Sequence, residues 1–249
     1  MSTLAVNNVS KRFGSLVALR DISLNVQKGE LRAIIGPNGA GKTTLFNLIS
    51  GFFPPSSGTV AFDGRDITAM PAHERVSLGI ARTFQITEIF PELTVFDNVR
   101  ISTEVTDGYR LRPWIGRAEA TAVHRQVEET LQLTGLDAKS GRLVGELAHG
   151  DQRAAESAMA LALRPRLLLF DEPTAGMGEQ ETYEITQLIS RLHRSGNFTI
   201  VLIEHDMRVI FHLADRITVL DQGILLAEGT PEEIAANEAV QAAYLVKAA

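Results

Sequence analysis

Nine consecutive residues decide the fold of this chain: Gly36, Pro37, Asn38, Gly39, Ala40, Gly41, Lys42, Thr43 and Thr44. They fit the pattern Gly-x-x-x-x-Gly-Lys-Ser/Thr, which is typical of loops that bind phosphate groups. The apolar run from Leu31 to Ile35 precedes them and predicts a short buried strand. The residues from Lys42 to Ser50 place apolar side chains on a helical period, and Gly51 predicts the end of that helix. The stretch therefore predicts a strand, a loop and a helix in that order.

The glycines of this loop allow a specific chemistry. They let backbone N–H groups surround phosphate oxygens at the N-terminus of the helix, where the helix dipole also favours negative charge. In this pattern Lys42 would reach the β- and γ-phosphates of a nucleotide, and the Thr43 hydroxyl would bind Mg²⁺. The alternative is a glycine-rich turn that carries an exposed lysine. The strand before the loop and the helix after it favour phosphate binding.

A second motif ends a buried strand with two carboxylates. The apolar run Leu167 to Phe170 leads directly into Asp171 and Glu172. Beside a phosphate-binding loop, Asp171 would hold Mg²⁺ through water, and Glu172 would orient and deprotonate the attacking water. The alternative is a core strand that leaves the interior through an acidic turn. Parallel neighbouring strands would bring the carboxylates beside the loop, which favours the catalytic interpretation.

Working outward, the N-terminal third predicts a layer of antiparallel strands. Leu4 to Val9, Val17 to Leu19 and Ile22 to Val26 are short strand-like runs. A second strand pair includes Thr59 to Phe62, and Asp63-Gly64 is a typical hairpin turn.

The C-terminal third predicts a parallel sheet. Leu167 to Phe170, Thr199 to Ile203 and Arg216 to Leu220 are buried-strand runs separated by helical stretches, which favours a parallel sheet with helices on both faces. Thr230 and Pro231, followed by a carboxylate three residues after the threonine, predict the start of a last helix.

Between these parts, residues 87–163 predict an inserted helical subdomain. Val123, Val127 and Leu131 recur every four residues, as on one face of a helix. Thr103 to Gly116 has no clear period and predicts an exposed loop.

The predicted fold class is therefore α/β, with a mostly parallel sheet core, an N-terminal antiparallel layer and a helical insert. We expect residues 1–249 to form a single domain, with a core built from residues 1–86 and 164–249.

Composition excludes several classes of protein. The chain has 249 residues, 45% of them hydrophobic, and no apolar run approaches the length of a membrane-spanning helix. Its 24 basic and 30 acidic residues give a net charge of −6, which disfavours nonspecific nucleic-acid binding. It has no cysteine, so disulfides, thiolate metal sites and cysteine nucleophiles are excluded. The first thirteen residues contain no apolar signal-peptide region, so we expect a cytoplasmic location.

Phe13, Gln85, His205 and the segment from Leu147 to Gln152 complete a larger pattern. With the two motifs above, their order and spacing resemble the ATP-binding subunit of ABC transporters over essentially the whole chain. The resemblance implies an ABC-type P-loop NTPase whose cofactors are ATP and Mg²⁺. It also implies that Phe13 stacks on adenine, that Gln85 senses Mg²⁺, the attacking water and the membrane partner, and that His205 contacts the γ-phosphate. For each residue taken alone there is an alternative: Phe13 as a core residue, Gln85 as a surface residue and His205 as a structural histidine.

The signature segment of that family is altered here. It reads Leu-Ser-Gly-Gly-Gln in most members and binds the γ-phosphate of the ATP held by the opposite subunit. In this chain the corresponding residues are Leu147, Ala148, His149, Gly150 and Asp151. The missing serine hydroxyl would weaken the composite site, unless backbone N–H groups suffice. Many members also carry an aspartate where this chain has Gly178, which affects how the two ATP sites communicate.

Four segments narrow the resemblance to the ATPases of branched-chain amino acid importers and the related urea and short-amide importers. They are Gly79–Gln85, Ala175–Met177, Ile203–Met207 and the C-terminal stretch from Gly229 to Leu245. The resemblance implies two integral membrane permease subunits, a second ATPase subunit in a heterodimer or a homodimer, and, indirectly, a periplasmic solute-binding protein. It places the chain at the cytoplasmic face of the membrane as a peripheral subunit.

Three alternatives accompany this interpretation. The first is a nucleotide-gated clamp with weak turnover, against which Glu172 argues. The second is an ABC protein of DNA repair or translation, which would need a long coiled-coil insertion or a second cassette. The third is a GTPase, which would need an Asn-Lys-x-Asp segment that this sequence lacks.

Overall fold

The computed structural model describes residues 2–83, 89–106 and 116–245. Its strands are β1 (Ser2–Phe13), β2 (Leu16–Gln27), β3 (Leu31–Ile35), β4 (Ser57–Phe62), β5 (Arg65–Asp66), β6 (Ile80–Arg82), β7 (Leu167–Asp171), β8 (Thr199–Ile203), β9 (Arg216–Asp221) and β10 (Ile224–Gly229). Its α-helices are α1 (Lys42–Ser50), α2 (Ala72–Ser77), α3 (Val95–Thr106), α4 (Arg117–Thr134), α5 (His149–Ala162), α6 (Glu179–Arg194), α7 (Met207–Leu213), α8 (Pro231–Ala235) and α9 (Glu238–Leu245). Two 3₁₀ turns, η2 (Asp137–Lys139) and η3 (Val144–Glu146), precede α5.

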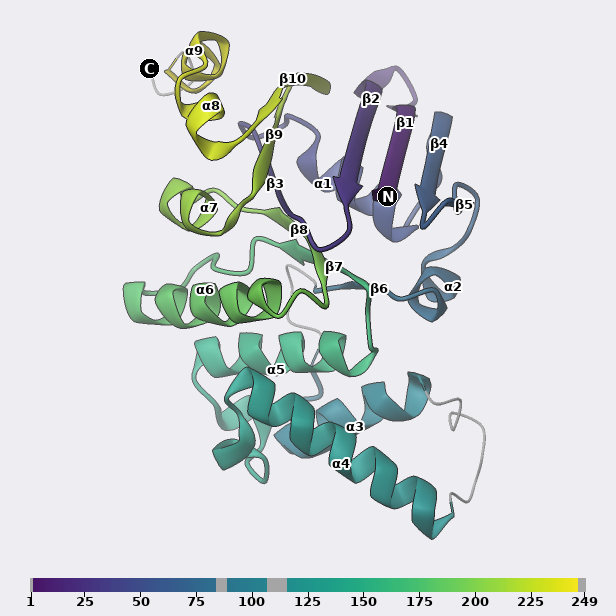
Figure 1. Ribbon diagram of the computed structural model, residues 1–249, viewed down its shortest axis with the longest axis vertical. Coiled ribbons are helices and arrows are strands. Elements are labelled where there is room, and N and C mark those ends of the chain that lie inside the picture. The colour runs from purple at the N-terminus through teal and green to yellow at the C-terminus, as the bar shows by residue number, and fades with distance from the viewer. Residues whose placement is uncertain (1, 84–88, 107–115, 246–249) are drawn as a thin grey trace.

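The strands form two sheets, as predicted (Figure 1). The antiparallel sheet has the order β2-β1-β4-β5, and β1 and β2 are longer than the runs that predicted them. Leu24 and Val26 of β2 are buried while the residues between and beside them are exposed, so this sheet buries one face. Asp63 and Gly64 both have positive φ, the conformation that a two-residue hairpin turn between β4 and β5 requires.

The second sheet has the order β10-β9-β3-β8-β7-β6. Neighbouring strands from β9 to β6 run parallel, and β10 pairs antiparallel with β9. All residues of β3, β7 and β8 are buried, which explains why these strands are continuous apolar runs. The sequence did not predict β6 or β10, because β6 has three residues and β10 is only partly buried.

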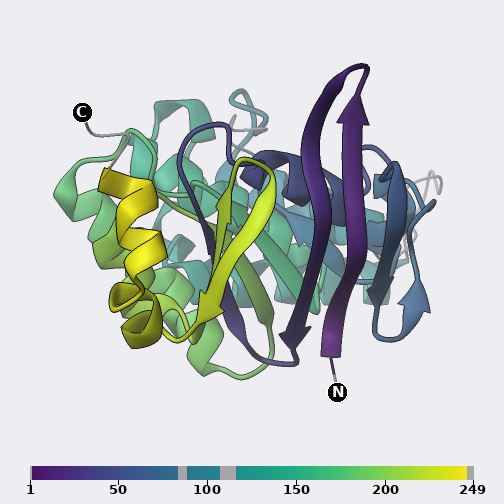
Figure 2. The ribbon, with the colours of Figure 1, turned by 90° about the horizontal axis from the view of Figure 1, so that it is seen from above.

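Helix α1 packs between the two sheets. Its Phe46 belongs to the same buried cluster as Leu24 and Phe62 of the antiparallel sheet and Leu169 and Val201 of the parallel sheet. Figure 2 shows β1, β2 and β4 side by side on one side of the molecule, and α9 on the other.

On its opposite face the parallel sheet packs against other helices. Phe170 and Leu202 of the sheet contribute to a cluster that also contains Ile189 of α6 and Ile210 of α7. The prediction of helices on both faces is therefore confirmed, with the antiparallel sheet covering α1.

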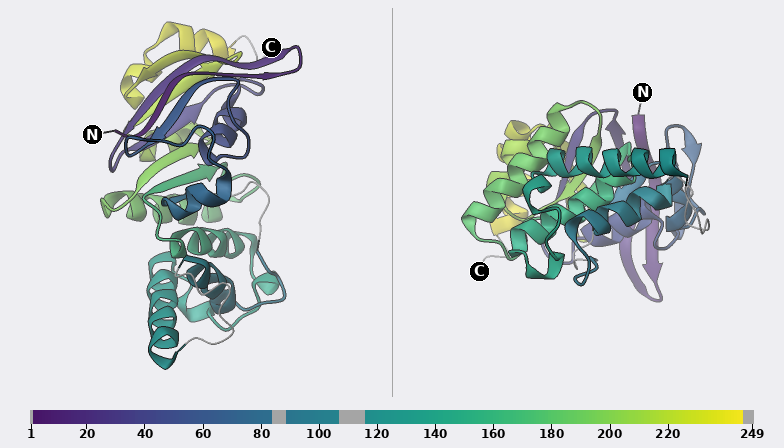
Figure 3. Two further views of the ribbon diagram at one scale, coloured as in Figure 1. Left: turned by 90° about the vertical axis from the view of Figure 1, so that its right-hand side faces the viewer. Right: turned by 90° about the horizontal axis from the view of Figure 1, so that it is seen from below.

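The predicted helical segment contains α3, α4 and α5, which pack on one another at one end of the molecule (Figure 3). Val123, Val127 and Leu131 are buried on α4, as their spacing predicted. The predicted loop from Thr103 to Gly116 was wrong at its start, because α3 continues to Thr106. The buried Thr103 hydroxyl donates to the carbonyl of Val99, so the helix satisfies this polar group internally. Residues 107–115 lie outside the described residues.

Near the C-terminus, Thr230 and Glu233 cap α8 as predicted. The Thr230 N–H donates to the Glu233 carboxylate over 2.8 Å, and the Glu233 N–H donates to the Thr230 hydroxyl over 3.3 Å. Within the described ranges, none of the helices is long and apolar enough to span a bilayer.

Arg75 of α2 holds the C-terminal end of α1 in place. Its side chain is 1% exposed. It donates hydrogen bonds to the carbonyls of Leu48, Ile49, Ile67, Thr68 and Met70. Two of these carbonyls belong to α1, whose last C=O groups lack partners within the helix. Burial lowers the pKa of Arg75 to about 10, so the side chain stays cationic at neutral pH.

Gly36 makes a close contact between the end of β3 and the end of β9. Its φ is 151°, and a Cβ at this position would lie 2.1 Å from the Leu220 carbonyl oxygen. At Gly39 no atom of the described residues lies within 4 Å of such a Cβ, although φ is also positive. Gly36 is therefore required by packing, and Gly39 only by its backbone conformation.

We expect Arg75→Met to lower the free energy of unfolding by about 3 kcal/mol or more, because it leaves several buried carbonyls without a donor. Urea denaturation measures the effect. Arg125→Met, at an exposed position of α4, is the matched control and should change stability by less than about 0.5 kcal/mol. Equal unfolding midpoints for the two variants would contradict the structural role of Arg75.

We expect Gly36→Ala to lower the free energy of unfolding by about 3 kcal/mol or more, because the new methyl group overlaps a strand carbonyl. Gly39→Ala should cost only about 1–2 kcal/mol, the strain of a left-handed alanine. Denaturation without nucleotide compares the two variants. The contact between β3 and β9 is refuted if Gly36→Ala is as stable as Gly39→Ala.

Candidate functional site

The Gly36–Thr44 loop forms the floor of a cavity of about 560 Å³. The lining residues are Phe13, Leu16, Val17, Ala18, Asn38, Gly39, Ala40, Gly41, Lys42, Thr43, Thr44, Glu172 and Gln222. The β1–β2 hairpin thus supplies one wall, and the end of β7 supplies another. A Cβ at Gly41 would lie 2.5 Å from Leu19 and 2.9 Å from the Ala18 carbonyl, so the hairpin fits tightly against the start of α1. The first residues of α1, Lys42, Thr43 and Thr44, line this cavity at the positive end of the helix dipole.

Lys42 lies at the base of this cavity. It is 6% exposed, and its Nζ donates to the carbonyls of Gly36 over 2.7 Å and Pro37 over 3.2 Å. Burial lowers the pKa of Lys42, while the nearby carboxylates of Glu172 and Asp171 oppose that change. This geometry contradicts the alternative of an exposed lysine on a glycine-rich turn.

Asp171 is the last residue of β7 and is 2% exposed. Burial raises the pKa of its carboxyl, and the hydrogen bond and positive charge of Arg82 oppose that change. Nη2 of Arg82 lies 2.6 Å from Oδ2 of Asp171, and Nη1 donates to Asn47 and Ser50 of α1. The sequence did not predict Arg82 as a site residue, because a basic residue at the end of a three-residue strand is too common a pattern to indicate a site.

Glu172 lies beside His205, a contact that the sequence did not predict. Oε1 of Glu172 is 2.8 Å from Nε2 of His205. Its backbone has a φ of 50°, a left-handed conformation that costs a non-glycine residue about 1 kcal/mol or more. The Glu172 N–H donates to the carbonyl of Ile203 over 2.9 Å, which holds this turn against the end of β8. Backbone strain of this kind clusters at functional sites.

Phe13 enters the cavity from the end of β1. Its ring is 46% exposed and contacts Phe53 edge to face, with 5.4 Å between centroids. Lys11 Nζ lies 5.1 Å from the Phe13 centroid and 4.5 Å from the Phe53 centroid. Phe13 is therefore held at its edge while part of its surface stays accessible, which contradicts the alternative of a core phenylalanine.

The altered signature segment lies at the start of α5. Among the described residues that line the loop cavity, none comes from Leu147–Asp151. Ala148 is the N-cap of α5, and its methyl group cannot accept a hydrogen bond from the helix. The Gly150 N–H instead donates over 3.1 Å to Oε1 of Glu181, a residue of α6. Asp151 forms an ion pair with Lys139, with Nζ 2.6 Å from Oδ2.

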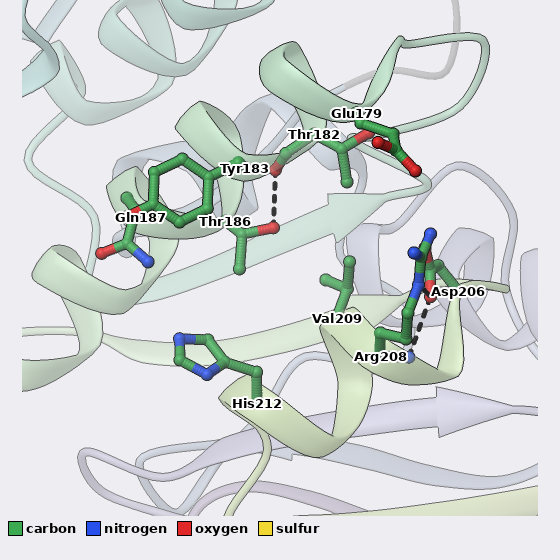
Figure 4. Close-up of a pocket in the computed structure, with 9 residues that line it drawn as sticks. All are labelled: Glu179, Thr182, Tyr183, Thr186, Gln187, Asp206, Arg208, Val209 and His212. Atoms are coloured by element: carbon green, nitrogen blue, oxygen red, sulfur yellow. Dashed lines mark hydrogen bonds and ion pairs between the residues drawn. The ribbon is translucent and has the colours of Figure 1, made fainter.

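Two further features complete this region. Gln85 lies outside the described residues. A second groove of about 420 Å³ lies between α6 and α7. Figure 4 shows the side chains that line it, with Arg208 beside Asp206. Its lining residues include none of the predicted site residues, so the groove is distinct from the loop cavity.

Comparisons with known proteins agree with this geometry. Residues 19–175 match the family described as ABC transporter. Residues 225–245 match a second family, the branched-chain amino acid ATP-binding cassette transporter.

Two curated relatives cover nearly the whole chain. One is the high-affinity branched-chain amino acid transport ATP-binding protein LivG of Salmonella typhimurium, which is 41% identical over 98% of both chains. The other is the corresponding protein BraF of Pseudomonas aeruginosa, which is 38% identical over 98% of both chains.

A solved structure of an ATP-binding cassette of an ABC transporter has the same fold. Its TM-score is 0.86 and its sequence identity is 30%, over 98% of this chain and 99% of the other. We conclude that the chain belongs to the ABC transporter family as an ATP-binding subunit, an ATPase whose activity is coupled to transport.

Proposed function

We propose that this subunit binds ATP with Mg²⁺ in the loop cavity and hydrolyses it to drive uptake of branched-chain amino acids or a related small polar solute. One observation carries the site: the buried Lys42 faces Glu172, and Glu172 contacts His205, at a cavity floored by helix N–H groups. The match of residues 225–245 and the names of LivG and BraF support the choice of solute.

The cavity has room and chemistry for each part of ATP. Adenine stacks on the accessible surface of Phe13 at the hairpin end. The triphosphate extends toward α1, where the N–H groups of Gly39 to Thr44 donate to its oxygens. Lys42 leaves its carbonyl partners Gly36 and Pro37 and pairs with the β- and γ-phosphates.

The residues present fit a magnesium ion that is bound partly through phosphate. Thr43 would supply an oxygen ligand of the kind that Mg²⁺ prefers, Asp171 would hold the ion through water, and Gln85 would add a further oxygen. Within the described residues no group of three or more acidic, histidine or cysteine side chains could hold a metal ion. We therefore propose that the nucleotide phosphates supply the other ligands. When bound, the cation offsets negative charge on the β- and γ-phosphates.

Glu172 is the proposed general base. Its carboxylate accepts a proton from the attacking water, whose oxygen bonds to the γ-phosphorus as the bond to the β,γ-bridging oxygen breaks. His205 turns from Glu172 toward the γ-phosphate and donates to one of its oxygens, so both side chains act at the same reacting group.

The second half of each site comes from an opposed ATPase subunit. Leu147, Ala148, His149, Gly150 and Asp151 would face the γ-phosphate held by that subunit, where the Gly150 N–H is the principal donor. In the single chain this N–H is occupied by Glu181, so closure of the dimer replaces a carboxylate with a phosphate oxygen.

Coupling to transport requires the membrane subunits. We propose that Gln85 and the helical insert, residues 87–163, pass the motion of the closing dimer to two permease subunits at the cytoplasmic face of the membrane. A periplasmic solute-binding protein delivers the solute to those permeases. Nucleotide binding supplies the differential affinity that shifts the open and closed populations.

The alternative of a nucleotide-gated clamp with weak turnover is favoured over the transport ATPase by the altered residues at the expected subunit contact. The missing hydroxyl at Ala148 and the missing carboxylate at Gly178 remove two polar side chains at the expected subunit contact. The strained Glu172 beside His205 favours turnover, because a clamp has no need of a base.

We expect Glu172→Gln to keep nucleotide binding and to lower kcat about 100-fold or more, because the amide cannot accept the proton from water. Calorimetry with Mg-ATP and steady-state phosphate release measure the two quantities. Lys42→Ala is the contrasting variant and should lose tight binding itself. Wild-type turnover by Glu172→Gln would remove the glutamate from the role of base, and wild-type binding by Lys42→Ala would place the nucleotide elsewhere.

We expect Ala148→Ser to raise kcat/KM for ATP roughly ten-fold in the assembled transporter, because one hydrogen bond to a charged oxygen is worth about 1.5–3 kcal/mol. A serine at this position also caps α5, so Gly116→Ser, at the N-cap of α4, is the matched control for added helix capping alone. An unchanged rate for Ala148→Ser would show that backbone N–H groups suffice.

A further inference from the structure

Glu204 is a buried carboxylate between the two segments that carry the reacting side chains. It follows the last residue of β8 and directly precedes His205. It is 4% exposed, and a charged side chain at this depth is costly unless hydrogen bonds compensate it. The ATP-binding and hydrolysis roles proposed above do not use it.

Three donors surround this carboxylate. Oε1 accepts from the Thr174 N–H over 2.9 Å and from the Thr174 hydroxyl over 2.6 Å. Oε2 accepts from the His205 N–H over 2.9 Å. Each oxygen thus binds a different segment, so Glu204 joins the turn after Glu172 to the turn that presents His205.

Thr174 and His205, the two residues that Glu204 joins, lie beside the reacting side chains. Thr174 is two residues after Glu172, and the side chains of Glu172, Thr174, Glu204 and His205 all line one small cavity of about 250 Å³. The residue after His205, Asp206, caps α7 by accepting from the Arg208 N–H over 2.8 Å. Glu204 constrains the His205 N–H itself.

We propose that Glu204 is a positioning residue for hydrolysis: it binds Thr174 and the His205 N–H together and thereby holds the His205 backbone where the imidazole contacts Glu172 and can turn to the γ-phosphate. This inference rests on the proposed function of Glu172 and His205. It assigns to Glu204 no contact with nucleotide, water or Mg²⁺.

The chemistry of the three donors suggests a selective variant. Glu204→Gln keeps the size of the side chain but replaces one acceptor oxygen with an NH₂ donor. If the amide oxygen accepts from Thr174, the NH₂ group faces the His205 N–H, donor against donor; the opposite orientation sets the NH₂ group against the Thr174 N–H. Either way one backbone link is lost. Thr174→Val removes only the hydroxyl and tests the other end of the link.

A matched control exists at the opposite edge of the same sheet. Glu30 is 8% exposed, precedes β3, and accepts from the Gln27 N–H over 2.8 Å and from Arg32 over 2.6 Å. Glu30→Gln therefore perturbs a buried glutamate without touching the strand ends that carry the site. It should lower stability and leave kcat unchanged.

In the assembled transporter we expect Glu204→Gln to lower kcat about ten-fold and Thr174→Val about three-fold, with KM for ATP and Mg-ATP affinity within about two-fold of wild type. If Glu204 acts through His205, then Glu204→Gln in a His205→Ala background lowers kcat no further. The proposal is overturned if kcat of Glu204→Gln stays within two-fold of wild type, or if the ten-fold loss persists without the imidazole.

Failure of the underlying function has a different signature. If Glu172→Gln hydrolyses ATP at the wild-type rate, the base assignment fails. Hydrogen exchange at the Thr174 and His205 amides then tests the link alone: Glu204→Gln should speed exchange at one of these amides at least ten-fold relative to Glu30→Gln, and equal protection would refute the link.

Discussion

Parallel pairing of β3, β8 and β7 is the constraint on which the site depends. Parallel strands end at the same edge of a sheet, so the loop after β3, His205 after β8 and the carboxylates at the end of β7 meet there, although the loop and His205 lie more than 160 residues apart in the chain. The register Asp171↔Ile203 sets the two turns level, and the Glu172 N–H completes the alignment by donating to Ile203. A shift of one residue in this pairing would move the Asp171 and Glu172 side chains each to the other face of the sheet.

Each charged group at this edge has a hydrogen-bond partner within the chain. Lys42 is held by carbonyls of its own loop, Asp171 by Arg82, and Glu172 by His205. In the proposed function, a nucleotide and its cation would replace these partners, so that binding exchanges existing contacts. Arg82 also binds Asn47 and Ser50, which links the carboxylate to the helix that carries the phosphate-binding N–H groups.

The two faces of the parallel sheet perform different tasks. One face packs on α1 and the antiparallel sheet, which positions Phe13 and closes one wall of the cavity. The other packs on α6 and α7 and leads toward the signature helix α5. The contact between Glu181 and Gly150 joins α6 to α5, so the segment that follows Glu172 touches the segment that we propose faces an opposed subunit.

Local sequence determined much of this. Buried apolar runs, a glycine-rich loop and a threonine–glutamate cap each depend on interactions within a few residues, so the loop, α1 and the three central parallel strands were predicted with nearly their observed limits. The start of α8 was predicted too, but as the start of the last helix, whereas α9 follows it. The end of α3 was not predicted, because this helix packs on α4 and α5, and its weak helical pattern does not reveal those tertiary contacts. Arg82, Glu204 and Glu181 could not be recognised from sequence either: a charged residue near a strand end is ordinary, and its role exists only where distant strands and helices place its partners within hydrogen-bond distance. Sequence alone thus determined which chemistry the chain carries, while tertiary structure decided which side chains hold it in position, because hydrogen bonds between distant segments depend on a geometry that local sequence does not encode.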